Sequence, residues 1–148
     1  MNFKDLKIDS AWTLFLDRDG VINKKIKDGY VLSVNDLELI PGSLRAIKIL
    51  SNIFGRLFIV TNQQCIGKRL LSMSQLDDIH DYMLGMIRDE GGDISEIFVS
   101  PHLEKAKDPF RKPGTGMADK AVSLYPETDL SRSLMVGDTV TDMLFGKR

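Results

Sequence analysis

The sequence predicts an α/β protein in which a mostly parallel sheet is covered by helices on both faces, giving three layers. Residues 13–16 and 57–60 are short continuous apolar runs that each end abruptly in polar residues, as buried parallel strands do. Segments with apolar residues at helical spacing alternate with these runs. This alternation implies right-handed crossovers and a ligand site at the carboxyl ends of the strands.

The N-terminal part of the chain, up to residue 56, contains one predicted strand and one predicted helix. The strand at 13–16 leads directly into Asp17-Arg18-Asp19-Gly20, so the first acidic residues follow its C-terminal end. Residues 21–41 are mixed in character, which predicts a long loop with a small hairpin around Tyr30-Val31-Leu32. Residues 44–53 show helical spacing of apolar side chains, and this predicts a helix that faces the core.

The rest of the chain repeats the pattern. The strand at 57–60 ends in Thr61-Asn62-Gln63, and Ser74, three residues before Asp77, predicts the capped start of a helix that Gly91-Gly92 ends. The remaining predicted elements are a strand at 94–99, a helix at 117–125 and a strand at 134–136 that runs into Gly137-Asp138.

The composition indicates one globular domain over residues 1–148, with 43% hydrophobic and 28% charged residues. A formal charge of -1 provides no global field for nucleic acid or an anionic membrane, and no apolar stretch approaches the ~20 residues of a membrane span. One cysteine and no signal-like start favour a cytoplasmic protein. The chain stops inside a further expected helix with no strand after it, which suggests a missing C-terminal piece. The oligomeric state stays open.

Four carboxylates are expected at neighbouring strand ends: Asp17, Asp19, Asp138 and Asp142. Such a cluster stays ionised only around a cation, and a site with few protein oxygens suits Mg²⁺, which keeps several waters and binds substrate phosphate. Asp17 is a candidate nucleophile, and Asp19 is a candidate acid and base. Thr61, Asn62 and Lys112 would donate to the charge on a transferred phosphoryl group.

Four separated motifs resemble those of the haloacid dehalogenase-like superfamily, in the family's order. They are Leu16-Asp17-Arg18-Asp19-Gly20-Val21, Val60-Thr61-Asn62-Gln63, Arg111-Lys112-Pro113 with Gly116-Met117, and Val136-Gly137-Asp138 with Asp142. The Asp-Arg-Asp-Gly-Val form, Gly29-Tyr30-Val31, Ile40-Pro41-Gly42-Ser43 and Arg-Lys-Pro resemble the branch that contains histidinol-phosphate phosphatases and D,D-heptose 1,7-bisphosphate phosphatases. The likeness covers roughly residues 12–146.

The resemblance implies a Rossmann-like fold and a phosphatase, because an acid at the position of Asp19 is typical of the superfamily's phosphatases. It implies Asp17 as nucleophile, Asp19 as acid and base, and Mg²⁺ held by Asp17, the Asp19 backbone carbonyl and Asp138, with Asp142 in support. Arg111 and Lys112 would contact phosphate. The spacing between motifs leaves no room for a cap domain, so loops 24–30 and 66–71 are expected to contact the substrate.

Close relatives carry a zinc loop where this chain has Ser100, His102, Asp108 and Phe110. Only His102 is a strong zinc ligand, and a structural zinc site needs four nitrogen or sulfur donors. No zinc is therefore expected, and packing alone is expected to hold loop 101–110.

Several alternatives remain open. The preferred substrate is heptose bisphosphate; the others are histidinol phosphate, a nucleic-acid 3′ end, or a phosphate ligand bound without turnover. Asp142 could support the metal site or simply provide a charge at a helix N-terminus. The basic run Lys24, Lys25 and Lys27 could steer a phosphorylated substrate or form a solvated loop, and Cys65 is expected to be an ordinary half-buried thiol.

Overall fold

Four parallel strands form one sheet in the order β3-β2-β1-β4 in the computed structural model, which describes residues 2–148. The pairings are parallel throughout, with Leu14 of β1 beside Leu57 of β2 and beside Leu134 of β4. The strands are β1 (Thr13–Leu16), β2 (Arg56–Asn62), β3 (Glu96–Ser100) and β4 (Ser133–Val136).

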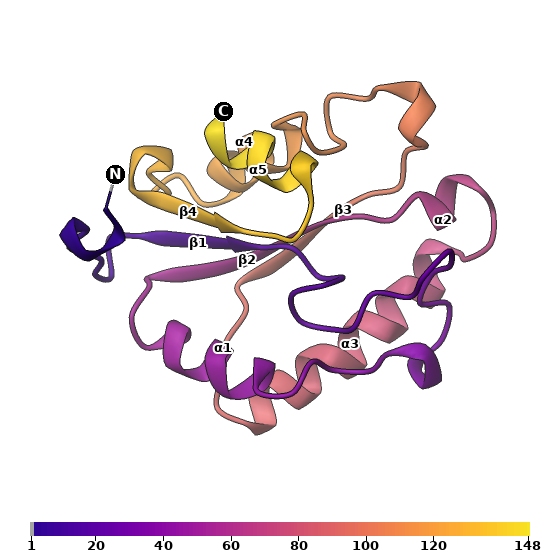
Figure 1. The fold of residues 1–148 in the computed structure, drawn as a ribbon, viewed down its shortest axis with the longest axis horizontal. Helices are drawn as coiled ribbons and strands as arrows, with labels where there is room; N and C mark the ends of the chain where they lie inside the picture. Colours follow the sequence, from indigo (N-terminus) through magenta and orange to yellow (C-terminus); the bar gives the residue numbers. More distant parts are fainter. Residues whose placement is uncertain (1) are drawn as a thin grey trace.

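Helices cover both faces of this sheet, with α1 and α3 on one side and α4 and α5 on the other (Figure 1). The α-helices are α1 (Ser43–Ser51), α2 (Gln64–Gly67), α3 (Met73–Asp89), α4 (Gly116–Leu124) and α5 (Val140–Lys147). Four short 3-10 helices lie at Phe3–Asp5, Val34–Asp36, Glu104–Ala106 and Leu130–Arg132. The three-layer, Rossmann-like α/β prediction is confirmed, and the described residues contain no cap domain.

Two apolar cores form because successive side chains of a strand point to opposite faces. Leu14 and Leu16 pack toward α1 and α3, in a core that also contains Ile47 and Met83. Phe15 packs toward α4 and α5, in the second core. The central strand β2 is buried on both faces, which explains why the sequence of β2 is a continuous apolar run rather than an alternating one.

The carboxyl ends of all four strands lie at the same edge of the sheet (Figure 1). The segments that follow β1, β2 and β4 therefore meet there, together with the loop that follows β3. No helix among residues 2–148 is long and apolar enough to cross a membrane.

Two local predictions were wrong. Within the described residues, Tyr30-Val31-Leu32 form no hairpin, and Val31 is instead buried against the core below the loop. The cap of α3 is Ser72 rather than Ser74, because the helix begins at Met73. Ser72 Oγ accepts from Gln75 N at 3.1 Å, and Gln75 Oε1 accepts from Ser72 N at 2.9 Å, which completes a capping box.

The Ser72→Ala substitution is expected to lower the free energy of unfolding by about 1 kcal/mol, because it leaves the Gln75 amide without its acceptor. The matched substitution Ser74→Ala, at an exposed position within the first turn of the same helix, should change it by less than about 0.5 kcal/mol. Urea unfolding of both variants measures this difference. Equal losses would show that the capping box does not stabilise α3.

Candidate active site

Asp17 lies at the first position after β1, and its backbone N–H donates to the carbonyl of Val136 at 2.9 Å. The side chain is almost fully buried. Its Oδ1 accepts from the backbone N–H of Arg18 at 2.8 Å and from Lys112 Nζ at 3.0 Å. The end of β1 therefore presents one carboxylate in a fixed orientation.

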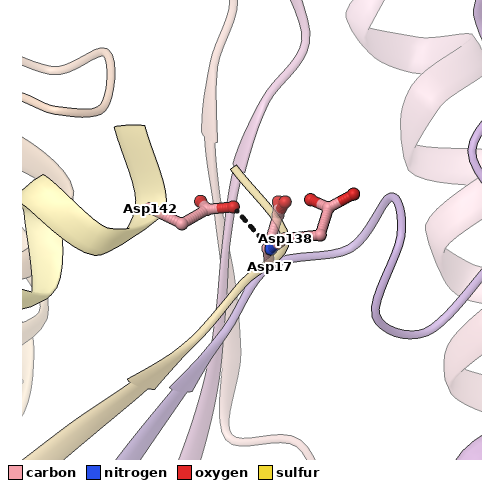
Figure 2. Close-up of side chains that lie close together, drawn as sticks. All are labelled: Asp17, Asp138 and Asp142. Atoms are coloured by element: carbon pink, nitrogen blue, oxygen red, sulfur yellow. Dashed lines mark hydrogen bonds between the residues drawn. The ribbon is translucent and has the colours of Figure 1, made fainter. Parts of the chain in front are cut away.

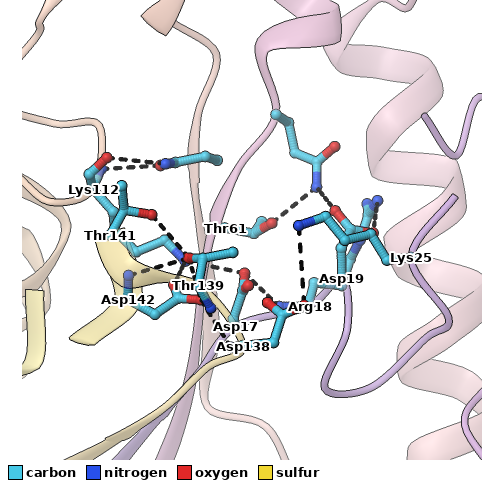
Figure 3. A network of polar contacts seen from close by, with 12 residues as sticks. Asp17, Arg18, Asp19, Lys25, Thr61, Lys112, Asp138, Thr139, Thr141 and Asp142 are labelled. Carbon is cyan, nitrogen blue, oxygen red and sulfur yellow. Dashed lines mark hydrogen bonds and ion pairs between the residues drawn. The ribbon is translucent and has the colours of Figure 1, made fainter. Parts of the chain in front are cut away.

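The ammonium group of Lys112 lies between two carboxylates (Figure 3). Its Nζ is 3.0 Å from Asp17 Oδ1 and 2.6 Å from Asp142 Oδ1, and the lysine side chain is only 2% exposed. The side-chain amide of Asn62 fixes the lysine backbone, because Asn62 Oδ1 accepts from Lys112 N and Asn62 Nδ2 donates to Lys112 O. Asn62 thus orients Lys112 through both ends of its amide, so this amide is already engaged.

Asp142 has two structural partners besides Lys112. It stands in the first turn of α5, where its Oδ2 accepts from Thr139 Oγ1 at 2.8 Å and from the backbone N–H groups of Asp138 and Thr139. Figure 2 shows the bond from Asp138 N. Asp142 is therefore a helix N-terminal acid and also a member of the acidic cluster, which combines the two alternatives left open by the sequence.

Three carboxylates converge at this point (Figure 2), since Asp17, Asp138 and Asp142 each offer an oxygen within 4.8 Å of the others. The donors just described occupy both oxygens of Asp142. No hydrogen bond from another described residue reaches Asp17 Oδ2, and among the described residues Asp138 forms an ion pair only with Lys25, at 4.0 Å. The free oxygens for a hard cation thus belong to Asp17 and Asp138, and an all-oxygen donor set of this kind fits Mg²⁺.

Two glycines allow this close approach. Gly20 has a φ of +83°, and a Cβ built on it would lie 2.0 Å from Asp138 Oδ2. A Cβ on Gly137 would lie 2.3 Å from the Asp142 side chain. Any larger residue at either position would push a carboxylate out of the cluster.

Burial raises the pKa of Asp17 to about 7, with a further contribution from the nearby Asp142 charge, while Lys112 opposes the shift. Burial acts in the same direction on Asp142, but the Lys112 ammonium and the hydrogen bonds from Lys112 and Thr139 outweigh it, so the pKa of Asp142 is lowered. The positive charge of the Lys112 ammonium group is therefore balanced mainly by Asp142. Asp17 is the carboxylate that lacks a full counter-charge.

Asp19 lies apart from the three converging carboxylates. Its Oδ1 accepts from Arg18 Nη2 at 2.9 Å and from Asn23 Nδ2 at 2.8 Å, and its Oδ2 accepts from Gln63 Nε2 at 3.0 Å. Burial acts to raise the pKa of Asp19, but the Arg18 charge and these hydrogen bonds together lower it. The Asp19 side chain is thus ionised and held by its neighbours, and it is not one of the carboxylates of the cluster.

Thr61 is fully buried, and its Oγ1 accepts from Gln63 Nε2 at 2.8 Å. Because that nitrogen also donates to Asp19, Gln63 links the segment after β1 to the end of β2. The accepted bond leaves the hydroxyl hydrogen of Thr61 available for donation.

Arg111 lies at the end of loop 101–110, and its Nη1 donates to the backbone carbonyl of His102 at 3.3 Å. His102 Nε2 is 3.5 Å from Asp108 Oδ1, and the backbone N–H of Glu104 donates to Gln64 Oε1. The expectation that packing alone holds this loop was wrong, because polar contacts tie it both to itself and to α2. The positions of the relatives' zinc ligands hold a buried serine, this His102–Asp108 contact and the partly buried Phe110.

Most of these residues surround a cavity of about 230 Å³, whereas Asp138 and Thr61 are not among its lining residues. Asp17, Asp19, Asn62, Arg111, Lys112 and Asp142 all line it. It also receives four residues that the sequence did not single out for the site: Gln63, Gln64, Thr139 and Thr141. Gln63 is the last residue of the second motif, and Thr139 directly follows Asp138 of the fourth motif. These positions in the sequence were the signal that could have identified both residues.

Substrate-facing loops come partly from the expected regions. Lys25, Ile26, Gly29 and Tyr30 line the cavity, whereas no residue of loop 66–71 does. Lys68 of that second loop instead donates to the hydroxyl of Tyr30 at 2.7 Å. In the basic run, Lys24 pairs with Glu38 and only Lys25 is directed to the site (Figure 3).

Cys65 was predicted to be half-buried, but it is completely buried below the site. Burial raises the pKa of its thiol, and Sγ lies 3.7 Å from Gln63 Oε1. Its place at the start of the short helix α2, which turns into the core, explains the difference.

The sequence is similar to a known protein family and to several curated proteins. A family model for HAD-hydrolase-like proteins matches residues 109–148. The chain is similar to the D-glycero-alpha-D-manno-heptose-1,7-bisphosphate 7-phosphatase of Mycobacterium tuberculosis, with 34% identity over 132 residues, 89% of this chain and 70% of the relative. It is also similar to the D-glycero-beta-D-manno-heptose-1,7-bisphosphate 7-phosphatase of Pasteurella multocida, with 36% identity over 143 residues, 90% of this chain and 74% of the relative.

Among solved structures, the fold is similar to D,D-heptose 1,7-bisphosphate phosphatase from B. bronchiseptica, which was crystallised with magnesium and phosphate. The TM-score is 0.80 at 32% identity, and the match covers 90% of this chain and 74% of the other. The fold, the order of the motifs and these relatives agree. The chain belongs to the haloacid dehalogenase-like superfamily of phosphatases, in the branch of the heptose-bisphosphate phosphatases.

Proposed function

We propose that this protein is a Mg²⁺-dependent phosphatase that removes phosphate from a phosphorylated sugar through an aspartyl-phosphate on Asp17, with a heptose 1,7-bisphosphate as the preferred substrate. One observation supports this most strongly. A nearly buried carboxylate, a buried lysine and a second acid two residues after the first share one cavity at the carboxyl ends of the strands.

In the proposed reaction, an oxygen of Asp17 bonds to phosphorus while the ester P–O bond breaks, and the leaving oxygen takes a proton from Asp19. The resulting Asp19 carboxylate then accepts a proton from water, whose oxygen bonds to phosphorus and releases phosphate and Asp17. The lowered pKa of Asp19 gives it the ionised state that this second step needs, and Asp19 has to be protonated before the first.

Three donors would stabilise the charge on the transferred group. Lys112 supplies a full positive charge beside Asp17, Thr61 a hydroxyl hydrogen, and Arg111 a guanidinium that lines the cavity. Asn62 contributes by fixing the Lys112 backbone, since both ends of its amide are used there.

Asp17 and Asp138 would hold Mg²⁺, together with the Asp19 backbone carbonyl, and Asp142 would support them through Lys112 and the backbone N–H of Asp138. A bound Mg²⁺ would neutralise the clustered carboxylates and polarise the oxygens of the phosphoryl group. The magnesium and phosphate in the B. bronchiseptica crystal support this assignment.

The substrate assignment relies on the relatives, which are named heptose-1,7-bisphosphate phosphatases and so favour a sugar over histidinol phosphate. The intact pair Asp17 and Asp19 favours turnover over binding alone. For a nucleic-acid end, the formal charge of -1 offers little attraction.

Purified protein with Mg²⁺ is expected to release phosphate from a panel of sugar phosphates, fastest from heptose 1,7-bisphosphate. Asp17→Asn should lower kcat by at least about 10³-fold, because an amide cannot form the phospho-intermediate. Asp89→Asn makes the same charge change at an exposed position at the end of α3 and should leave kcat within about twofold. Equal phosphate release by the Asp17→Asn and Asp89→Asn variants would refute the proposal. A wild-type protein that releases no phosphate from any substrate of the panel would also refute it.

A second prediction concerns stability without metal. The folded-state pKa of Asp17, about 7, exceeds the ordinary value of 3.8, so the folded protein binds the extra proton between these pH values. The stability that the neutral carboxyl contributes is complete below about pH 4 and is lost as the pH rises through about 7. Asn is neutral at every pH. In EDTA, the free energy of unfolding of the Asp17→Asn variant should therefore increase relative to that of the wild type as the pH rises, by at most about 4 kcal/mol.

Urea unfolding in EDTA at pH 5 and pH 8 measures this gain, and the difference between the two proteins cancels the contributions of other groups. Added Mg²⁺ at pH 8 should then stabilise the wild type and not the variant. A difference between the proteins that is the same at both pH values would contradict the raised pKa of Asp17.

We also propose that the protein works without bound zinc, because Ser100, Asp108 and Phe110 leave His102 without the soft partners that a structural site needs. Protein purified from zinc-supplemented medium should contain far less than one equivalent of zinc by elemental analysis. Zinc near one per chain would contradict this.

A further inference from the structure

Arg18 is fully buried, although its guanidinium carries a permanent charge. The side chain extends from the segment after β1 toward helix α3. Nε and Nη2 both donate to Oδ1 of Asp19, at 3.3 and 2.9 Å, and Nη1 lies 3.1 Å from Nε2 of His80. A buried arginine needs acceptors for its N–H groups, and these two residues supply them.

The chemistry of arginine fixes the state of His80. Arginine can only donate, so His80 Nε2 is the acceptor, and the imidazole is neutral with its proton on Nδ1. Burial first, and the Arg18 charge second, lower the pKa of His80 to about 3. His80 therefore stays a neutral acceptor through the neutral pH range and does not act as a pH switch.

A neutral partner has a consequence for Asp19. An acidic residue in place of His80 would satisfy the same N–H group but would also neutralise the guanidinium charge. Histidine at this position accepts the hydrogen bond from Nη1 without adding a negative charge. The positive charge of the Arg18 guanidinium is therefore paired with Asp19 alone.

Arg18 and His80 act from outside the cavity. Asp19 lines it, whereas neither of the other two does, so neither would touch the substrate. Asp19 itself has a side chain that is 27% exposed and would turn easily without its partners. Asn23 and Gln63 also hold it, but only Arg18 makes two bonds to one of its oxygens and carries a charge.

We propose that Arg18 and His80 are positioning residues that hold Asp19 in the orientation for proton transfer to the leaving oxygen. This inference rests on the proposed function, in which Asp19 is the acid and base. Two tasks within the site then belong to different residues. Lys112 stabilises the charge of the phosphoryl group next to Asp17, and the pair Arg18–His80 orients the proton donor Asp19.

The test compares two leaving groups. A sugar alkoxide needs a proton as it leaves, while 2,4-dinitrophenolate leaves without one. His80→Leu removes the acceptor of Arg18 and should lower kcat by about 10- to 100-fold for the best sugar phosphate, a part of the usual contribution of general acid catalysis. For 2,4-dinitrophenyl phosphate the rate of dinitrophenolate release in the first turnover, before Asp19 acts as a base, should change by less than about threefold. The KM for the sugar phosphate should stay the same, because the phosphate donors are intact.

His80→Gln is the matched control, since the amide oxygen of glutamine can replace Nε2 as an acceptor, and it should restore most of the lost sugar-phosphate turnover. A merely structural role of His80 would lower both activities in parallel with the folded fraction measured by circular dichroism, and that parallel loss would overturn the inference. Should His80→Leu not fold, Arg18→Lys replaces it, because lysine keeps the charge but cannot contact Asp19 and His80 as a fork.

Asp19→Asn separates this inference from the proposed function. The readout is the release of the leaving group in the first turnover, which precedes the base step. If Asp19→Asn slows this release from the sugar phosphate but not from 2,4-dinitrophenyl phosphate, and His80→Leu slows neither, only the positioning role is overturned. If Asp19→Asn itself shows no such selectivity between the two substrates, the acid role of Asp19 fails, and the inference fails with it.

Discussion

A buried lysine ammonium shared by two carboxylates is the interaction on which this site depends. Lys112 connects the end of β1, through Asp17, with the first turn of α5, through Asp142, and it comes from the loop before α4. A buried charge is expensive unless it is paired and hydrogen-bonded, and removal of one partner typically costs about 3–5 kcal/mol. The three segments are therefore held together by the same contacts that create the polar site.

The same interaction gives the acids different properties. Asp142 receives the lysine and three further donors, so its charge is compensated, whereas the burial of Asp17 is compensated only in part. Asp19, a few residues away, is stabilised as a carboxylate by Arg18. Environments that push the pKa values of neighbouring carboxyl groups apart are how one site assigns different tasks to chemically identical groups. Here the under-compensated acid faces the cavity where a cation and a phosphoryl group would complete its neutralisation.

The sequence was sufficient for the fold and for the grouping of Asp17, Asp138 and Asp142, because both follow from local pattern, but it did not predict that Asp19 lies apart from them. The apolar runs before Asp17 and Thr61 predict buried parallel strands, and parallel strands bring their carboxyl ends to one edge. Contacts that depend on tertiary structure were out of reach. The Arg18–His80 pair joins residues far apart in sequence, the Asn62 amide meets the Lys112 backbone, and Cys65 is buried because α2 turns inward. The cap at Ser72 was missed because Ser74, two residues later, offered an equally good local pattern.

Burial divides the site into a part that performs the chemistry and a part that can vary. Two of the side chains proposed to contact phosphate, Thr61 and Lys112, are buried at strand ends or directly against them, and any change there leaves an unpaired polar group. Lys25 and Tyr30 line the cavity from loops whose contacts are mostly solvent-accessible hydrogen bonds and pairs. Polar contacts within loop 101–110 do not require four soft ligands, so the loop can present Arg111 without a metal. Substrate preference can therefore change through these loops while the buried residues keep the same phosphoryl chemistry.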